Sequence, residues 1–436
     1  MKSVFLLIIT LFAFGTSKAQ EKEITKSGWN FGGLPTISFD SDLGFQYGAL
    51  ANVYNYGDGS RYPNYNHSLY FEVSRYTKGS AINRFFYDSD QLIEGLQTSF
   101  DLSYLTDKAY DFYGFNGYNS VIVPDILDKE NPSRYFYRYD RKLFRAKLDL
   151  QGALAGNNTR WTAGFNLQNF AIASVDFEQL NEGKTEGEKL AVENGLYDIY
   201  RVLGVISVDE ANGGFVPVLK GGIVYDTRDN RPNPMRGLWT EAIFEAAPGF
   251  VSSSNSFVKF ALIHRQYFTL VPRNLSLVYR VAYQTTLTGD VPFYYQSQMM
   301  TSFPNGVFSE GLGGAKSIRG MYRNRVIGDG IVYGNVEMRW KFVRFNFINN
   351  NFYLGLIGFT DFGRVVDQME VKATNASPVY RLSDYYTNGL EKMHMSYGAG
   401  LKIVMNENFV ISADYGRAID LQDGTSGMYI GLNYLF

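Results

Sequence analysis

The sequence predicts an all-β chain, a transmembrane antiparallel β-barrel of about 16 strands. Three observations lead to this prediction. Aromatic residues make up 16% of the chain and 44 of its 436 residues are glycine, a composition that favours strands over helices. Apolar and polar residues alternate along many short segments. The links between these segments are short and long in turn, which is typical of barrels that cross a membrane.

The first 19 residues have the pattern of a secretory signal peptide. Lys2 supplies the positive charge, an apolar run follows, and Ser17-Lys18-Ala19 forms a small-residue cleavage site. An N-terminal membrane anchor is the alternative, but the apolar run is too short to span a bilayer. The chain has no Cys, which excludes a lipidated N-terminus. We therefore expect a signal peptide at 1–19, a short periplasmic segment at 20–28 and a barrel at 29–436.

The charge balance narrows the function classes. The chain has 41 basic and 43 acidic residues, and the predicted signal removes only Lys2 and Lys18, so the mature chain stays slightly acidic. That balance argues against a general nucleic-acid binder. No run of about 18 apolar residues is present, so no transmembrane helix is expected.

Period-two alternation defines the strands. In residues 332–342, VYGNVEMRWKF, Met338 and Trp340 lie on one side, and Glu337 and Arg339 lie on the other. The same pattern recurs in FRAKLDLQ at 144–151 and FVISADY at 409–415. The predicted strands are 29–40, 44–56, 67–77, 80–89, 95–106, 136–152, 158–173, 215–227, 236–248, 256–270, 274–287, 331–343, 352–363, 396–405, 408–417 and 427–436.

The links favour a membrane barrel over a soluble β-sandwich, which would also alternate. Links after the sixth, tenth and fourteenth strands are short, whereas those after the fifth, seventh, eleventh and thirteenth are long. This alternation places both termini in the periplasm. Aromatic residues such as Trp340, Phe342, Tyr434 and Phe436 lie near strand ends, as interfacial girdles require. A membrane-spanning sheet must close into a barrel, because open sheet edges cannot face lipid.

The C-terminus, YIGLNYLF, resembles an outer-membrane sorting signal. Tyr429, Gly431, Tyr434 and the terminal Phe436 are the residues that carry this resemblance. We expect Tyr434 and Phe436 to continue the apolar outer face of the last strand. The alternative is an ordinary last strand that happens to end in Phe.

A glycine-rich loop, GLGGAKSIRGMYRNRVIGDG at 311–330, separates the eleventh and twelfth strands. It contains Ile318-Arg319-Gly320, and acidic residues follow at Glu337 and Asp361 on the next two strands. Asp361 stands in GFTDFG. A guanidinium in a narrow lumen needs carboxylates with the geometry for forked hydrogen bonds.

These motifs resemble those of the BamA/TamA-like outer-membrane assembly-factor superfamily, also called the bacterial surface antigen family. A second likeness is the turn YDTRDNRPNPMRG, with Asp226, Arg228, Asp229, Asn233, Pro234 and Gly237 in the family order. FYGFNGYN at 112–119 is a weaker third likeness. The resemblance implies that the sixth external loop folds into the lumen and that Arg319 pairs with Glu337, Asp361 or both. Met321 departs from the pattern, because the family has an aromatic residue there, although Tyr322 follows.

The resemblance also implies a function, namely insertion or export of proteins, or handling of lipids, at the bacterial outer membrane. Expected partners are outer-membrane lipids, client outer-membrane proteins, periplasmic chaperones or a separate partner protein. Residues 20–28 are too few for the periplasmic POTRA domains of the family, so we expect the barrel to act without its own receptor domain. The alternative is a passive pore or transporter, whose selectivity would come from lumen groups such as Arg145, Lys147 and Lys341.

No catalytic, cofactor or metal site is predicted. GLGGAKS lacks the glycine that a nucleotide-binding loop has before lysine. His67, His264 and His394 are far apart and lack metal-ligand spacing. No Gly-x-Ser-x-Gly elbow is present. The charged groups of the 226–237 turn are better explained as a turn network than as acid–base catalysts.

Overall fold

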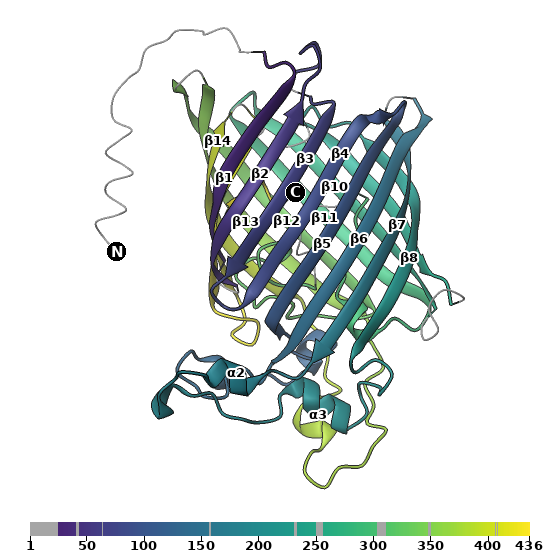
Figure 1. The fold of residues 1–436 in the computed structure, drawn as a ribbon, viewed down its shortest axis with the longest axis vertical. Coiled ribbons are helices and arrows are strands. Elements are labelled where there is room, and N and C mark those ends of the chain that lie inside the picture. The colour runs from purple at the N-terminus through teal and green to yellow at the C-terminus, as the bar shows by residue number, and fades with distance from the viewer. Residues whose placement is uncertain are drawn as a thin grey trace.

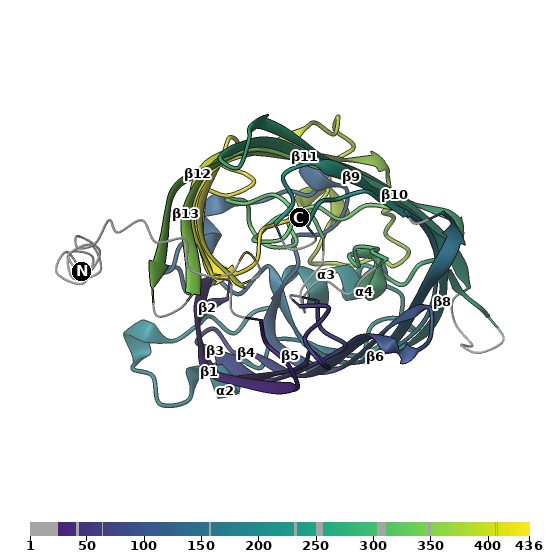
Figure 2. The same cartoon turned by 90° about the horizontal axis from the view of Figure 1, so that it is seen from above.

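The computed structural model describes residues 25–436 except 41–42, 63, 157, 231–232, 250–255, 303–310, 348–349, 406 and 408. The predicted signal peptide at 1–19 lies outside the described residues. Within them, sixteen antiparallel strands form a closed barrel in which each strand pairs with its neighbours in sequence and β1 closes on β16 (Figures 1 and 2). The predicted fold class and strand number are confirmed.

The strands lie close to their predicted positions. Their bounds are β1 Trp29–Asp40, β2 Gly44–Asn55, β3 His67–Tyr76, β4 Ser80–Ile93, β5 Leu96–Asp111, β6 Arg138–Ala155, β7 Thr159–Ala173, β8 Gly213–Asp226, β9 Gly237–Ala247, β10 Phe257–Val271, β11 Leu275–Gly289, β12 Gly330–Phe347, β13 Asn350–Asp367, β14 His394–Met405, β15 Phe409–Ala418 and β16 Ser426–Leu432.

Side chains alternate between two environments along each strand. On β12, Glu337 and Arg339 are buried in the lumen, whereas Met338 and Trp340 are about half exposed on the outer wall. The lumen is filled with ion pairs between neighbouring strands. Examples are Arg141 with Asp107 at 2.7 Å and Lys402 with Asp414 at 2.7 Å. Pairing of this kind offsets the loss of hydration inside the barrel.

The long links gather at one end of the barrel, where α2 and α3 lie beyond the strands (Figure 1). We call the links 112–137, 174–212, 290–329, 368–393 and 419–425 L3, L4, L6, L7 and L8. They contain η1 Gly117–Asn119, η2 Pro124–Leu127, α2 Phe177–Asn181, η3 Glu186–Glu188, α3 Leu196–Val202, α4 Phe293–Gln296 and η4 Leu382–Asp384. No helix in the described ranges is long and apolar enough to cross a membrane.

An aromatic core joins these links to the strand ends and covers this mouth of the barrel. Phe112 of L3 packs edge-on against Tyr200 of α3 and Phe293 of α4, with ring centroids 6.0 and 6.1 Å away. Tyr197 of α3 packs at 5.3 Å against Tyr139 of β6. Links far apart in the sequence are thereby held in one cap.

The C-terminal residues differ from the prediction. β16 ends at Leu432, and Asn433 takes a left-handed conformation with φ 70°. The chain then turns inward, and its end lies over the middle of the barrel when viewed along the axis (Figure 2). Tyr434 is buried against Tyr353, and the Phe436 carbonyl accepts a 3.0 Å hydrogen bond from Arg339. The expectation that Tyr434 and Phe436 extend the outer face was wrong, because the turn at Asn433 breaks the alternation.

Candidate functional site

L6 enters the lumen as a tight hairpin-like turn, in which two segments of the loop run antiparallel. Leu312 pairs with Val326 in an isolated bridge, and the Gly314 nitrogen donates to the Met321 carbonyl at 3.2 Å. The Ser317 hydroxyl accepts from the Gly313 nitrogen at 2.8 Å, which closes the turn before the tip. The tip itself is Ile318-Arg319-Gly320, and its three residues are almost fully buried.

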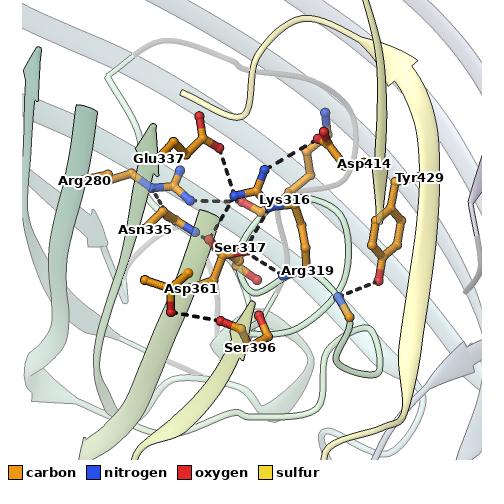
Figure 3. A network of polar contacts seen from close by, with 12 residues as sticks. Arg280, Lys316, Ser317, Arg319, Asn335, Glu337, Asp361, Ser396, Asp414 and Tyr429 are labelled. Carbon is orange, nitrogen blue, oxygen red and sulfur yellow. Dashed lines mark hydrogen bonds and ion pairs between the residues drawn. The ribbon is translucent and has the colours of Figure 1, made fainter. Parts of the chain in front are cut away.

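Arg319 is held by carboxylates from three strands (Figure 3). Its Nε and Nη2 donate to the two oxygens of Asp361 on β13, both at 2.9 Å, in the forked geometry that guanidinium favours. Nη2 also lies 2.8 Å from Glu337 on β12. Asp414 on β15 lies 3.5 Å from Nη1. The structure therefore brings together all three residues that the sequence placed in this contact, and it adds Asp414.

The charge balance of the site favours the ionised arginine. Burial alone would lower the pKa of Arg319, but the carboxylates of Asp361, Glu337 and Asp414 outweigh that effect and raise the pKa above its ordinary value. The guanidinium carbon also lies 3.4 Å from the ring centroid of Phe359, a cation–π contact. Phe359 stands opposite Glu337 in the register of β12 and β13, on the lumen side, and this contact explains why an aromatic residue is there.

Close backbone packing also fixes the tip. Gly320 has φ 93°, and a Cβ there would lie 2.5 Å from the carbonyl carbon of Gly416 on β15. A Cβ on Gly416 would in turn lie 2.6 Å from the carbonyl carbon of Arg319. Each position therefore requires glycine, because any side chain would separate the loop from the wall. The Gly320 nitrogen donates to the Tyr429 hydroxyl at 3.1 Å.

The residue that departs from the family pattern is accommodated by a shift of one position. Met321 is buried in an apolar cluster with Ile318, Leu312 and Val365. Tyr322 stacks on Tyr113 of L3 with ring centroids 5.5 Å apart. The aromatic contact of the loop is therefore made by Tyr322.

Sequence reasoning missed several residues that hold the loop. Asn335 on β12 donates to the Ser317 carbonyl at 2.7 Å, and Arg280 on β11 donates to the Asn335 side chain at 2.8 Å. Asp414 stands on the polar face of the predicted strand 408–417, but nothing in the sequence linked that strand to L6. Tyr429 was assigned only to the sorting signal, whereas the structure directs its hydroxyl toward Gly320.

The turn between β8 and β9 forms a second polar network at the other end of the barrel. Asp226 pairs with Arg228 at 2.7 Å, and the Asp229 carboxylate accepts from the Met235 nitrogen at 3.0 Å. Asn233 donates to Glu407 in the β14–β15 turn at 2.6 Å, next to the buried Pro234. Gly237 has φ 99°, and a Cβ there would lie 2.3 Å from the Thr227 carbonyl oxygen. The motif residues thus fold the turn and tie it to a distant turn.

His394 holds several of the long links together. Its Nδ1 lies 2.8 Å from both carboxylate oxygens of Asp423 in L8, and its Nε2 lies 3.0 Å from Glu391 in L7. Tyr118 of L3 stacks on the imidazole at 4.0 Å and donates to Asp423 at 2.6 Å. In the ranges that the structure describes, no group of three or more His, Cys, Asp and Glu residues has the arrangement of a metal site.

Comparison with known protein families shows which family this chain belongs to. The model of the Omp85 superfamily domain matches residues 65–436. The chain belongs to the Omp85 superfamily. This confirms the resemblance drawn from the loop and turn motifs. Omp85 barrels are bacterial outer-membrane proteins that act as insertion or translocation factors, and this Omp85 protein is placed in the outer membrane accordingly.

Two solved structures share the fold. BamA from Haemophilus ducreyi lacking POTRA domains 1–3 matches with a TM-score of 0.54 and 14% identity, covering 94% of this chain and 71% of that one. CdiB from Escherichia coli matches with a TM-score of 0.53 and 10% identity, covering 93% of this chain and 62% of that one. At such identities the likeness establishes the fold. A search of curated proteins found no significant match.

Proposed function

We propose that this Omp85 barrel inserts or translocates client molecules at the outer membrane by opening its wall between β1 and β16. Client outer-membrane proteins and outer-membrane lipids are the proposed partners. The barrel performs no chemical reaction of its own in this proposal. The observation that carries it is the short pairing of β1 with β16, together with the attachment of L6 to the same place.

We call the junction of β1 with β16 the seam, and in the described residues it is the shortest strand pairing in the wall. In the described residues β1 and β16 align only at Phe39 with Ile430 and at Asp40 with Tyr429. On its other edge, β16 pairs with β15 from Ile411 to Arg417. Because hydrogen bonds between neighbouring strands hold a barrel closed, the wall should part first where the fewest are made. Pro35 of β1 also lacks a backbone donor, which fits a weakly paired edge.

L6 contacts the seam directly. Tyr429 stands in the register position opposite Asp40 of β1, and its hydroxyl accepts the Gly320 hydrogen bond. Within the described residues, the inward turn of residues 433–436 also leaves residues 29–38 of β1 without a partner from β16. Release of the L6 tip and separation of β1 from β16 would therefore both change the surroundings of the Tyr429 side chain.

The alternative function is a passive pore or transporter for small solutes or lipids. Polar lumen groups such as Arg145 and Lys341 favour it. Against it, the lumen groups are largely paired with one another, L6 crosses the interior, and the aromatic core covers the external mouth. Solute passage would require several buried contacts to break at once.

A disulfide across the seam separates the two functions. The chain has no native Cys, so Phe39→Cys with Ile430→Cys introduces a single bridge between residues that face each other. The matched control is Leu219→Cys with Ala246→Cys, a facing pair on β8 and β9. Each variant replaces the native protein in cells, and the outer-membrane proteome and lipid asymmetry are measured with and without reductant.

The proposal expects loss of client proteins or of lipid asymmetry only for the oxidised seam variant, with recovery on reduction. Normal membrane composition in cells whose seam is fully cross-linked would overturn it. Unchanged composition in the seam variant, combined with lost uptake of a solute in a strain that lacks the whole barrel, would favour the pore.

A further inference from the structure

The outer wall of β3–β6 carries three exposed basic side chains at its external end. Arg75, Lys108 and Lys142 face away from the lumen, and all three are exposed. Among the described residues none of them has a carboxylate within ion-pair distance, whereas the lumen-facing Arg84, Arg141 and Arg145 all do. Arg75 donates to the Ser74 carbonyl at 2.8 Å and to the Asn83 side chain at 3.4 Å, but neither contact neutralises its charge. Cations without a carboxylate on a lipid-facing wall call for an anionic partner from outside the chain.

Strand register places these cations in a defined arrangement. Arg75 of β3 aligns with Ala81 of β4, which aligns with Thr106 of β5, which aligns with Lys142 of β6. Arg75 and Lys142 therefore stand on one row, about 14 Å apart at roughly 4.8 Å per strand spacing. The two residues between them are small. Lys108 lies one step further toward the external end, beside the β3–β4 turn, where a Cβ on Gly79 would lie 3.3 Å from its Cβ.

The rows directly below are apolar except for Asn83 of β4, whose side chain accepts a 3.4 Å hydrogen bond from Arg75. The next row across the same four strands lies two residues further from the external end on each strand. It consists of Val73, Asn83, Tyr104 and Phe144. Below it, Phe71 packs against Phe85 with ring centroids 5.0 Å apart, and Phe85 packs against Phe100 at 6.2 Å. Basic groups at the membrane boundary above an aromatic wall match the two parts of an anionic lipid, its charged headgroup and its acyl chains.

From this arrangement we propose that the outer wall of β3–β6 binds a phosphorylated glycolipid of the external leaflet. Arg75 and Lys142 contact phosphates at the two ends of a disaccharide headgroup, with Lys108 between them, and the acyl chains lie along Tyr104, Phe144 and the phenylalanine stack. Arginine suits the forked recognition of phosphate oxygens, and lysine acts as a point charge. Asp140, two residues from Lys142 on the same face, is the carboxylate that opposes the site and limits its affinity.

This site is independent of the seam, because β3–β6 lie in a different part of the wall from β1 and β16. It would fix the orientation of the barrel against the external leaflet whether or not the seam opens. Failure of the seam experiment therefore leaves the lipid site standing, and the reverse also holds.

Native mass spectrometry of the purified full chain tests the proposal with a diphosphorylated diglucosamine glycolipid and its dephosphorylated form. The test variant is Arg75→Gln with Lys142→Gln. The matched control is Arg364→Gln with Arg417→Gln, which removes two outer-wall cations near the external ends of β13 and β15. These two do not share a row, because Arg417 aligns through Tyr397 with Thr360 rather than with Arg364.

We expect the wild type and the control to hold one phosphorylated lipid through detergent exchange. The test variant should bind about tenfold to thirtyfold more weakly, as expected for two cations at an anionic surface. The charge-conserving exchange Arg75→Lys with Lys142→Arg, which also checks folding, should retain most of the binding. Inorganic phosphate should not displace the lipid. Equal retention by the test variant and the control, or equal binding of the dephosphorylated lipid, would overturn the proposal.

Discussion

The hydroxyl of Tyr429 on β16 lies 3.1 Å from the backbone nitrogen of Gly320 at the tip of L6. The same tyrosine stands opposite Asp40 of β1 at the barrel seam. One side chain thus connects the loop in the lumen to the place where the wall closes. Because the hydroxyl accepts from a backbone group, the contact depends on the position of the tip and not on its side chains.

Replacing Tyr429 by Phe removes this acceptor and keeps the ring. The Gly320 nitrogen then lacks its hydrogen bond in a buried place, at a cost of about 1–3 kcal/mol to the docked loop. We expect faster hydrogen exchange in residues 317–322 and faster proteolysis of L6. Tyr397→Phe, on the exposed outer wall, is the control and should match the wild type. Identical exchange in both variants would mean that Tyr429 does not hold the loop.

Arg319 and Asp361 should show strong energetic coupling. Arg319→Ala leaves buried carboxylates uncompensated, at a cost of about 3–5 kcal/mol. A double-mutant cycle with Asp361→Asn, followed by thermal unfolding of the folded barrel, measures the coupling directly. Arg319→Lys should recover only part of it, because an ammonium lacks the planar fork. A coupling energy near zero would contradict the role assigned to this pair.

Gly416 tests the steric fit of the loop without altering any charge. Gly416→Ala places a methyl group 2.6 Å from the Arg319 carbonyl carbon, so the tip must move away from β15. We expect weaker protection of L6 from protease in a barrel that still folds. Gly221→Ala on β8 is the control, because a Cβ there has no atom within 4 Å. Normal protection in Gly416→Ala would show that the tip does not pack as tightly as the geometry requires.

The strands and the polar contact of L6 could be predicted because both leave local patterns. Alternation marks a strand, and in residues 332–342 it placed Glu337 on the side opposite Met338 and Trp340. The family motifs then supplied the pairing with Arg319. Asp414 and Tyr429 could not be reached in this way, because their roles depend on how β15 and β16 stand against a loop more than 90 residues away in sequence.

The C-terminus shows the limit of pattern reasoning more sharply. Continued alternation favoured an outward Tyr434 and Phe436, and one left-handed residue, Asn433, reversed that outcome. Asn tolerates a positive φ, but many Asn residues in strands do not adopt it. The inward turn depends on partners such as Arg339 and Tyr353, whose positions follow only from the closed barrel.

Cysteine labelling tests the orientation of the barrel in the membrane. A cysteine at Gly183 in L4 should react with an impermeant reagent on whole cells, and one at Asn274 in the β10–β11 turn should react only after the outer membrane is opened. The chain has no Cys of its own, so each variant reports on a single position. Labelling of position 274 on intact cells would mean that the barrel is inverted.

Deletion or replacement of Phe436 separates its predicted sorting role from its place in the folded barrel. The Phe436 ring lies 5.0 Å from the Arg339 guanidinium and 5.2 Å from that of Arg280. Phe436→Ala removes both contacts and the terminal aromatic residue, so it should slow assembly and lower the stability of the folded barrel. Arg339→Gln removes the lumen partner but keeps the terminal Phe. If sorting depends on Phe436, pulse-chase measurement of the heat-modifiable form should show slow assembly for Phe436→Ala and a near-normal rate for Arg339→Gln. Equal rates for Phe436→Ala and the wild type would remove the sorting role and leave only the packing of the C-terminus in the lumen.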